Sequence, residues 1–355
     1  MNNPQFGFGI IGAGMIAHFH AKAIKEIRNA KLEMIYDSNK YHADEFAHQF
    51  SCKSCNSLEE MLSNPQIEII CICTPSGAHL EPARSVIAAG KNCLIEKPLE
   101  ITVERCEKII QAARQANVKT GVVFPSRFYK AEKQLKEAIN KKRFGNLVLG
   151  DAYVKWYRSL EYYKSGSWRG TWKLDGGGAL MNQGVHSVDL LQWYMGPIAS
   201  VQAISANRLH NNIEVEDTVV CAIQFANGAL GSIECSTAAF PGTLKRIEIR
   251  GTEGSAVLEE DKLIEWNFRE KSEEDESIVI AMKDEHFSLG GVSDPADISY
   301  KGHQWQIEDM MHAIEAGDDP SITADEGKKS VAIIEAIYKS AKTGAKIILE
   351  QNKVK

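Results

Sequence analysis

Short apolar runs alternate with amphipathic stretches through the first third of the chain. The runs have the length of strands, and the stretches between them repeat apolar residues every three or four positions, which is typical of helices. The runs are residues 6–11, 32–36, 68–73, 92–95 and 118–124, and the helical stretches are residues 16–27, 43–50, 78–89 and 103–116. Strands and helices that alternate in this way form right-handed βαβ units. The pattern therefore predicts an α/β domain with a parallel sheet over residues 1–124.

The pattern changes after residue 125, where strand-like runs follow one another and Asn227-Gly228 predicts a tight hairpin. An acidic run at residues 273–276 is predicted to be a solvated loop, and residues 283–300 a long loop. We expect strands at residues 148–157, 198–207, 217–225, 229–235, 246–250 and 255–259, and helices at residues 129–142, 180–194, 304–315 and 324–342. Residues 125–355 are therefore predicted to form an α+β domain with a mostly antiparallel, open-faced sheet.

One face of this second sheet is predicted to lack helices. Val219, Ala222, Ile223 and Phe225 form part of an apolar pattern that we assign to the uncovered face. A continuous apolar face of this kind is too unfavourable to leave in water. The sequence therefore predicts a homo-oligomer, either a homodimer or a homotetramer.

The charge balance excludes several classes of partner. The chain has 41 Lys and Arg against 47 Asp and Glu, a formal net charge of −6 at pH 7. Such a surface does not attract nucleic acid or anionic lipid overall. No apolar run reaches the roughly 18 residues that span a bilayer, and the N-terminus has no signal-like apolar core. We expect a soluble cytoplasmic protein without a nucleic-acid or membrane partner.

The eight cysteines fit a reducing compartment, because several lie in apolar strand-like runs, where a thiol acts as a small apolar side chain. Cys52 and Cys55 form a closely spaced pair. A zinc site would need a second ligand pair at a suitable spacing, and none lies nearby in the sequence. We predict reduced thiols and no metal site.

A glycine-rich turn joins the first predicted strand to the first predicted helix. It has the pattern G-x-G-x-x-A and comprises Gly12, Ala13, Gly14, Met15, Ile16 and Ala17. The first glycine permits a tight turn, the second lets the backbone approach a pyrophosphate, and the alanine lets the helix pack closely on the strand. The alternative, a glycine turn that only reverses the chain, does not explain this position between strand and helix. The first domain is therefore predicted to be a dinucleotide-binding Rossmann domain.

Asp37 lies at the end of the second predicted strand. An acidic residue at this point holds the adenosine ribose hydroxyls of a dinucleotide. Its carboxylate would repel the 2′-phosphate of NADP, so the predicted cofactor is NAD, with NADP less favoured. Lys40 leaves some tolerance for NADP.

Two further segments follow the third and fourth strands, at the edge where ligands bind in parallel sheets. They are Thr74-Pro75, with His79 shortly after, and Glu96-Lys97-Pro98. Together with the glycine turn, Gly176-Gly177-Gly178 and Asn182-x-Gly184-x-His186-x-x-Asp189, they resemble the Gfo/Idh/MocA family, the glucose–fructose oxidoreductase and inositol dehydrogenase group. The resemblance covers essentially the whole chain. Besides the turn and Asp37, it implies a cofactor site that includes Thr74, Pro75, His79, Glu96 and Lys97.

The resemblance also implies that Lys97 contacts the reacting hydroxyl and that His186 transfers the proton. An imidazole titrates near neutral pH and suits proton transfer as hydride leaves, and a cationic lysine stabilises developing alkoxide charge. The alternative for His186 is a structural hydrogen bond near a helix start. Many family members have Asp where this chain has Asn182, which can orient an imidazole or bind a hydroxyl but cannot take a proton. Asn182 is our third catalytic candidate.

An aromatic segment at residues 162–172 precedes the triple glycine. Trp168 and Trp172 can pack against the apolar faces of sugar rings, and Arg169 can bind a carboxylate or phosphate. The alternative is an aromatic core patch with a partly buried arginine. We expect Trp168, Arg169 and Trp172, with Lys97, Asn182 and His186, to bind the substrate.

These features predict an NAD(P)-dependent dehydrogenase that acts on CH–OH groups. It would transfer hydride between the nicotinamide and a secondary alcohol of a sugar, cyclitol or sugar derivative, so the predicted partner is a small carbohydrate-like molecule. The family also includes retaining glycosidases that use bound NAD transiently, and some members resemble non-catalytic NAD-binding regulators. The presence of Lys97 and His186 argues against a regulator.

Overall fold

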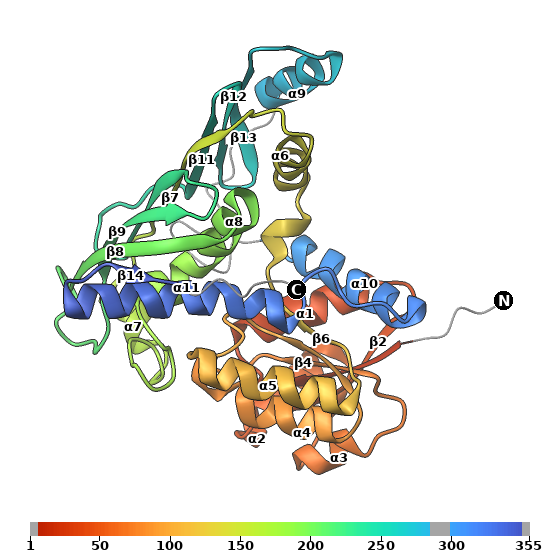
Figure 1. The fold of residues 1–355 in the computed structure, drawn as a ribbon. Coiled ribbons are helices and arrows are strands. Elements are labelled where there is room, and N and C mark those ends of the chain that lie inside the picture. The colour runs from red at the N-terminus through yellow and green to blue at the C-terminus, as the bar shows by residue number, and fades with distance from the viewer. Residues whose placement is uncertain (1–5, 285–298, 350–355) are drawn as a thin grey trace. The chain divides into compact units, whose positions relative to one another are not determined.

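The computed structural model of the chain describes residues 6–284 and 299–349. The chain divides into two compact units (Figure 1). Among the described residues, the first unit contains residues 6–125 and 299–331, and the second contains residues 126–284 and 332–349. Residues 299–331 thus group with the first unit. The division at residue 124 that we drew from the sequence keeps them in the second domain and stays a prediction.

The first unit is built on a six-stranded parallel sheet with the strand order β3-β2-β1-β4-β5-β6. The strands are β1 (Phe6–Ile11), β2 (Ala30–Tyr36), β3 (Lys53–Ser54), β4 (Ile69–Ile72), β5 (Asn92–Ile95) and β6 (Thr120–Val122). The helices are α1 (Met15–Glu26), α2 (Lys40–Phe50), α3 (Leu58–Leu62), η1 (Ser76–Ala78), α4 (Leu80–Ala88), α5 (Val103–Ala116), α10 (Lys301–Ala316) and the start of α11 (Ala324–Thr343). The order reverses between β1 and β4, as in the Rossmann fold. The predicted parallel α/β architecture is confirmed.

The last part of the chain returns to the first unit through α10. Met310 and Met311 of this helix are buried in the same core cluster as Ile24 of α1. Burying each of these side chains stabilises the unit by about 1.5–3 kcal/mol. Gln306 adds a polar contact, because its Oε1 accepts a hydrogen bond of 2.9 Å from the backbone N–H of Phe124. The first unit is therefore completed by residues from the far end of the sequence.

The second unit is built on an eight-stranded sheet with the strand order β13-β12-β11-β7-β10-β9-β8-β14. Only the β7–β10 pair is parallel among these strands. The strands are β7 (Leu147–Lys155), β8 (Ile198–Ala206), β9 (Thr218–Phe225), β10 (Leu230–Ser236), β11 (Arg246–Gly251), β12 (Gly254–Glu259), β13 (Lys262–Phe268) and β14 (Ile347–Ile348). The helical segments are η2 (Pro125–Phe128), α6 (Lys130–Asn140), α7 (Leu160–Lys164), η3 (Ala179–Gly184), α8 (Val185–Met195), α9 (Glu273–Asp284) and the end of α11. The predicted mostly antiparallel sheet is confirmed.

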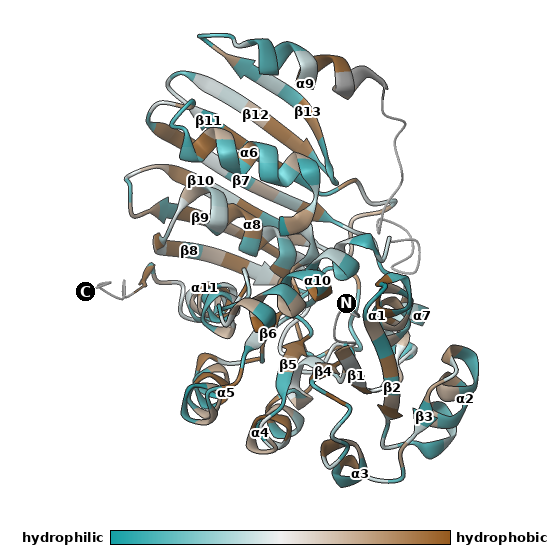
Figure 2. Cartoon of the chain, turned by 90° about the vertical axis from the view of Figure 1, so that its right-hand side faces the viewer, coloured by the Kyte–Doolittle hydropathy of each residue, from teal (hydrophilic) through white to brown (hydrophobic). Residues whose placement is uncertain are grey.

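Helices α6 and α8 lie against one face of this sheet (Figure 2). Val219, Ile223 and Phe225 are buried, whereas Val220 and Ala222 between them are exposed. Alternate residues of a strand point to opposite faces. Our assignment of Val219, Ile223 and Phe225 to the uncovered face is therefore wrong. Of the four residues that we assigned to that face, only Ala222 is exposed.

The acidic run at residues 273–276 forms the first turn of α9 and is not a loop. Asp275 accepts hydrogen bonds from Ser272 at the start of the helix. Acidic side chains in a first helical turn are stabilised by the helix dipole, so this run favours a helix start. Most of the predicted loop at residues 283–300 lies outside the described residues. No helix in the described parts of the chain combines the length and the apolar character needed to cross a membrane.

Candidate active site

The glycine turn after β1 has the geometry of a dinucleotide cradle. Gly12 has a φ of +96°, and a Cβ there would lie 2.7 Å from the carbonyl oxygen of Cys73, so only glycine fits. A Cβ on Gly14 would meet nothing within 4 Å, which leaves open space beside the start of α1. The first turn of α1 contains no acidic residue, and no side chain caps it. The helix N-terminus can therefore receive an anion, and the turn fits NAD.

Asp37 lies next to this turn. Its Oδ2 accepts a hydrogen bond of 2.7 Å from the backbone N–H of Ala13, and its Oδ1 accepts one of 2.8 Å from Asn39. The carboxylate therefore joins the end of β2 to the glycine turn. Lys40 forms an ion pair with Asp44 and a hydrogen bond with Ser54, so its ammonium group is engaged away from Asp37.

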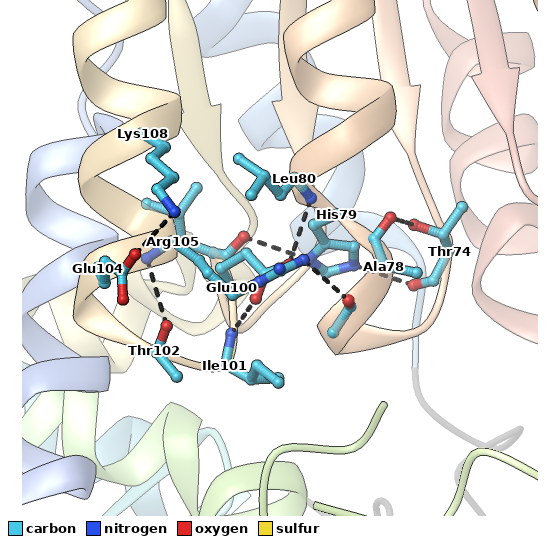
Figure 3. Close-up of polar contacts among 12 residues, drawn as sticks. Thr74, Ala78, His79, Leu80, Glu100, Ile101, Thr102, Glu104, Arg105 and Lys108 are labelled. Atoms are coloured by element: carbon cyan, nitrogen blue, oxygen red, sulfur yellow. Dashed lines mark hydrogen bonds and ion pairs between the residues drawn. The ribbon is translucent and has the colours of Figure 1, made fainter. Parts of the chain in front are cut away.

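His79 joins the two loops that follow β4 and β5 (Figure 3). Its Nε2 lies 2.9 Å from the carbonyl oxygen of Thr74, and its Nδ1 lies 2.9 Å from that of Pro98. The ring is buried. Both ring nitrogens face protein carbonyls, so His79 acts in this structure by holding the loops together. Its predicted contact with the cofactor stays a prediction.

Glu100, which follows Pro98 and Leu99 in the sequence, also stabilises these two loops. It is buried, and its Oε1 accepts hydrogen bonds from the backbone N–H of Leu80 and from Arg105 at 2.8 Å (Figure 3). Arg105 also donates to the carbonyl oxygen of Gly77. The loop that contains Thr74 and Pro75 is thus fixed to the segment after Lys97 by Glu100 of that segment and by Arg105 of α5.

Glu96 is held in a buried cluster with His20 and His303. His20 Nε2 lies 2.8 Å from Glu96 Oε1, and His303 Nε2 lies 3.6 Å from the same oxygen. Burial raises the pKa of Glu96. The hydrogen bonds and charge interactions with both histidines lower this pKa by more than burial raises it, so it lies below its usual value. Burial also lowers the pKa of His20. We interpret the pair as an ionised carboxylate that accepts a hydrogen bond from the N–H of a neutral imidazole.

These three residues are also the group of potential metal ligands that the described residues contain, with ligand atoms within 4.8 Å of one another. The sequence analysis predicted no metal site. The spacing of 2.8 Å between His20 and Glu96 is that of a hydrogen bond. Glu96 Oε2 also accepts a hydrogen bond of 3.2 Å from the backbone N–H of Lys97. The cluster therefore fixes the backbone at Lys97.

Lys97 is the one residue between Cys93 and Glu100 that is not buried. It follows β5 and precedes Pro98, to which it is joined by a cis peptide bond. The segment thus presents a single partly exposed side chain, an ammonium group, at the carboxyl edge of the parallel sheet. Ligands bind at this edge in open α/β sheets.

In the second unit, the triple glycine packs against two residues that the sequence analysis did not identify. A Cβ on Gly177 would lie 2.0 Å from the hydroxyl of Tyr338, and one on Gly178 would lie 1.7 Å from the carbonyl oxygen of Glu216. Glu216 accepts hydrogen bonds from the backbone N–H groups of Gly178 at 3.0 Å and Leu180 at 2.8 Å, and from the Tyr338 hydroxyl at 3.0 Å. The glycines therefore allow the start of η3 to pack on a buried carboxyl group.

Asn182 and His186 lie on the continuous helical segment formed by η3 and α8. Between Ala179 and Gln192 they are the two residues that are not buried. Asp189, one turn later, is buried and forms a bidentate ion pair with Arg127 at 2.7 and 2.6 Å. The segment thus presents Asn182 and His186 outward, while Asp189 has a structural role.

Asn182, at the position where many family members have Asp, lies next to the carboxylate of Asp175. Its Nδ2 donates to Asp175 Oδ1, and its Oδ1 accepts a hydrogen bond of 2.9 Å from Gln183. Gln183 also donates to the Tyr162 hydroxyl at 2.8 Å, which in turn accepts from Arg169 at 2.6 Å. The structure therefore brings Asn182 and Arg169 into one polar network.

The two predicted sugar-binding tryptophans lie at different places in this unit. The guanidinium of Arg169 lies 4.5 Å from the ring centre of Trp168. Trp172 is 46% exposed, and its ring centre lies 5.3 Å from that of Tyr338, with the two rings nearly perpendicular. Trp168 therefore belongs to the Arg169 network, while Trp172 packs beside the triple glycine.

Two protein-family models match the chain. Residues 6–124 match the oxidoreductase family with an NAD-binding Rossmann fold, and residues 133–257 match the GFO/IDH/MocA C-terminal domain. A solved structure of the WlbA dehydrogenase from Bordetella pertussis, in complex with NADH and UDP-GlcNAcA, is 32% identical with a TM-score of 0.89, and the match covers 99% of this chain and 100% of that one. The chain belongs to the Gfo/Idh/MocA family of oxidoreductases.

Other members of this family are also similar along much of the chain. An uncharacterised oxidoreductase of Synechocystis sp. is 30% identical over 74% of each chain. The 1,5-anhydro-D-fructose reductase of Ensifer adhaerens is 27% identical, and the match covers 95% of this chain and 96% of the reductase. The predicted family, the NAD cofactor and the class of CH–OH oxidoreductase are confirmed.

Proposed function

We propose that the protein is an NAD-dependent dehydrogenase that acts on a secondary alcohol of a sugar derivative, with Lys97 and His186 acting on the hydroxyl. These roles are supported by the partial exposure of the proposed residues to solvent. Lys97 in the first unit, and His186 with Asn182 in the second, are the polar side chains left partly exposed in otherwise buried segments. A buried framework that leaves such groups accessible is typical of a site that binds and reacts with a ligand.

The chemistry requires two transfers from the CH–OH group. NAD supplies the acceptor for the hydride. The remaining proton leaves the hydroxyl and passes to the imidazole of His186, which is suited to this role near neutral pH. The ammonium group of Lys97 donates a hydrogen bond to the same oxygen and stabilises the negative charge that develops on it. In the reverse direction His186 returns the proton as the carbonyl is reduced.

In this proposal Asn182 orients the substrate hydroxyl or the imidazole, and it does not transfer the proton. Its amide nitrogen is directed to Asp175, and its oxygen accepts from Gln183, so its side chain is fixed at both ends. A fixed amide one helical turn before His186 can hold a substrate hydroxyl or the imidazole. Asp175 supplies the negative charge near this point that Asn182 lacks.

The remaining parts of the proposal are the assembly and the compartment. We propose a homodimer or homotetramer formed through the uncovered sheet face, where Ile204, Val220 and Leu230 are exposed. None of the eight cysteines forms a disulfide, which fits a reducing cytoplasm.

The test is a panel of sugars, cyclitols, uronates and their nucleotide-linked forms, with NADH absorbance as the readout and aglycone release followed in parallel. We expect NADH formation that depends on both NAD and the sugar. Aglycone release without net NADH would show a glycosidase. NAD binding with no reaction on any compound would favour a regulator.

A further inference from the structure

A directional chain of hydrogen bonds fixes the side-chain amide of Asn182. Arg158 donates to Gln183 Oε1 at 3.0 Å, and because a guanidinium can only donate, the Gln183 atom that faces it is the oxygen. The amide nitrogen of Gln183 then donates to Asn182 Oδ1 at 2.9 Å. The amide nitrogen of Asn182 therefore lies on the other side, where it donates to Asp175 Oδ1. The chain begins at a buried cation and ends at a buried carboxylate.

Asp175 accepts hydrogen bonds at both of its oxygens. Its Oδ2 accepts one of 2.8 Å from the backbone N–H of Gly170, and its Oδ1 accepts the one from Asn182. A carboxylate accepts at both ends, whereas an amide has one accepting and one donating end. Position 175 therefore requires a carboxylate. Position 182 must accept from Gln183 and donate to Asp175, which requires an amide.

The directions of these bonds do not depend on the other contacts of the same side chains. Arg158 also donates to the carbonyl oxygen of Tyr157 at 3.0 Å. Asp175 and Asn182 have further interactions as well. An arginine only donates and an ionised carboxylate only accepts, whatever the partner, and the two N–H groups that face Asp175 favour its ionised form. Additional partners therefore leave the required donor and acceptor ends at positions 175 and 182 unchanged.

We propose that Asp175 is a positioning residue of the active site and that positions 175 and 182 form a coupled pair, which functions with one carboxylate and one amide. This inference rests on the proposed dehydrogenase function and adds a residue to it. Asn182 lies four positions before His186 on the continuous helical segment of η3 and α8, so their side chains lie on the same face. By fixing the amide, Asp175 determines whether Asn182 presents a donor or an acceptor beside the reacting hydroxyl.

The hydrogen-bond directions predict the effect of exchanging the two side chains. In Asp175→Asn the amide has a single accepting end for two donors, so either the N–H of Gly170 or the amide of Asn182 loses its acceptor. In Asn182→Asp two carboxylates face each other, and neither can donate unless it binds a proton. In the double variant the amide at position 175 accepts from Gly170 and donates to the carboxylate at position 182, which also accepts from Gln183. Each of these three contacts then has a donor and an acceptor again.

The test measures kcat and KM for NADH formation in both single variants and the double variant, with each compound of the sugar panel that reduces NAD. We expect kcat to fall about 10- to 100-fold in each single variant, because leaving a buried donor or acceptor without its partner displaces the groups of the site. The double variant should recover most of this loss. KM for NAD should change little, since the glycine turn belongs to the first unit. Glu161→Gln and Asn212→Asp, which remove and add a charge at exposed sites, are the controls.

Two further measurements do not need turnover and separate this inference from the proposed function. The urea midpoint of unfolding and the NMR signal of the His186 imidazole, assigned with His186→Ala, should both change in each single variant and return in the double variant. If no compound reduces NAD, the dehydrogenase proposal fails, and these two measurements decide the pair. A return of both in the double variant supports the pair, and any other result overturns it.

With an active protein, three results overturn the inference. The first is a double variant in which the reductions in kcat of the two single variants multiply. The second is a normal kcat in Asp175→Asn, which leaves a dehydrogenase without this positioning residue. The third is a double variant that does not fold, since the exchange keeps a partner for every group. If neither single variant folds, a folded and active double variant supports the pair.

Discussion

Glu216 accepts a hydrogen bond of 3.0 Å from the backbone N–H of Gly178. Because Gly178 directly precedes η3, this buried carboxyl group sets the start of the helical segment that contains Asn182 and His186. Burial raises the pKa of Glu216 to about 7, against the opposing effect of its hydrogen bonds. The segment with the proposed proton-transfer residue is therefore fixed by a group that titrates near neutral pH.

Glu216→Gln should change how stability depends on pH. The pKa of Glu216 is higher in the folded protein than in the unfolded chain, so the folded state binds more protons between these values. Its contribution to the free energy of unfolding is thus complete below about pH 4.5 and is lost as the pH rises through about 7. We expect this loss, about 3 kcal/mol for such a shift, to disappear in Glu216→Gln. Denaturant unfolding at several pH values measures it, and the exposed Glu276→Gln should retain it.

Asp37→Asn should narrow the preference for NAD over NADP. The substitution keeps an oxygen that can accept from the N–H of Ala13 but removes the charge that repels a 2′-phosphate. Like charges brought together cost several kcal/mol, so the ratio of the two affinities should change by about tenfold or more. Fluorescence titration at fixed salt measures both affinities, with Glu45→Gln as an exposed acidic control. Tighter binding of NADP by the unmodified protein would contradict the assignment.

His79→Leu should weaken NAD binding although its ring nitrogens face protein carbonyls. The change removes the ring nitrogens that lie 2.9 Å from the carbonyl oxygens of Thr74 and Pro98, so the loops after β4 and β5 lose their connection. We expect KM for NAD to rise about tenfold, the worth of one or two hydrogen bonds. The side-chain amide of His79→Gln can still donate a hydrogen bond. Its KM for NAD should therefore lie between those of the unmodified protein and His79→Leu. An unchanged KM in His79→Leu, equal to that of the exposed control His42→Leu, would rule out this role.

The sequence predicts the first unit well because its signals are local. Strand β5 and helix α5 have the bounds expected from the hydrophobic pattern, Asn92–Ile95 and Val103–Ala116. Such elements depend on residues within a few positions of one another. The same holds for the glycine turn, whose conformation at Gly12 follows from its own backbone.

Contacts between distant segments could not be predicted in this way. The return of α10 to the first unit depends on Gln306 and Phe124, which are 182 positions apart. The roles of Glu216 and Tyr338 beside the triple glycine also depend on tertiary packing, since neither residue belongs to a recognisable motif. Asp175 was missed for the same reason, although it supplies the charge that Asn182 lacks.

Ile204→Lys should disrupt the proposed oligomer. Ile204 lies opposite Val220 on neighbouring strands, and both are exposed on the face of the second sheet that α6 and α8 do not cover. A lysine at the centre of an apolar interface would be buried without a partner, which is strongly unfavourable. Sedimentation at micromolar concentration should show a smaller species than for the unmodified protein. Ile280→Lys, at an exposed site on α9, should leave the mass unchanged. A monomeric unmodified protein would refute the oligomer.

The proton-transfer assignment predicts that His186 and Lys97 act as one unit on the substrate hydroxyl. His186→Ala should reduce kcat by about 10²- to 10⁴-fold, the usual effect of removing a positioned acid–base group. Lys97→Ala should also reduce kcat, because the oxygen loses the cation that stabilises its developing charge. NAD affinity should barely change in His186→Ala, since His186 belongs to the second unit and the glycine turn and Asp37 belong to the first.

The double variant tests the coupling of these two residues. If they serve one proton transfer, His186→Ala combined with Lys97→Ala should be little worse than the poorer single variant, as groups that act together give non-additive effects. If the reductions in kcat of the two single variants instead multiply in the double variant, the two residues have independent roles, with Lys97 acting mainly in binding. Near-normal kcat in His186→Ala with the true substrate would exclude His186, and Asn182 could not replace it because an amide takes no proton. The proton would then have to leave through Tyr162, Tyr163 or a water. If both single variants were silent while NAD still bound, the dehydrogenase proposal itself would fail.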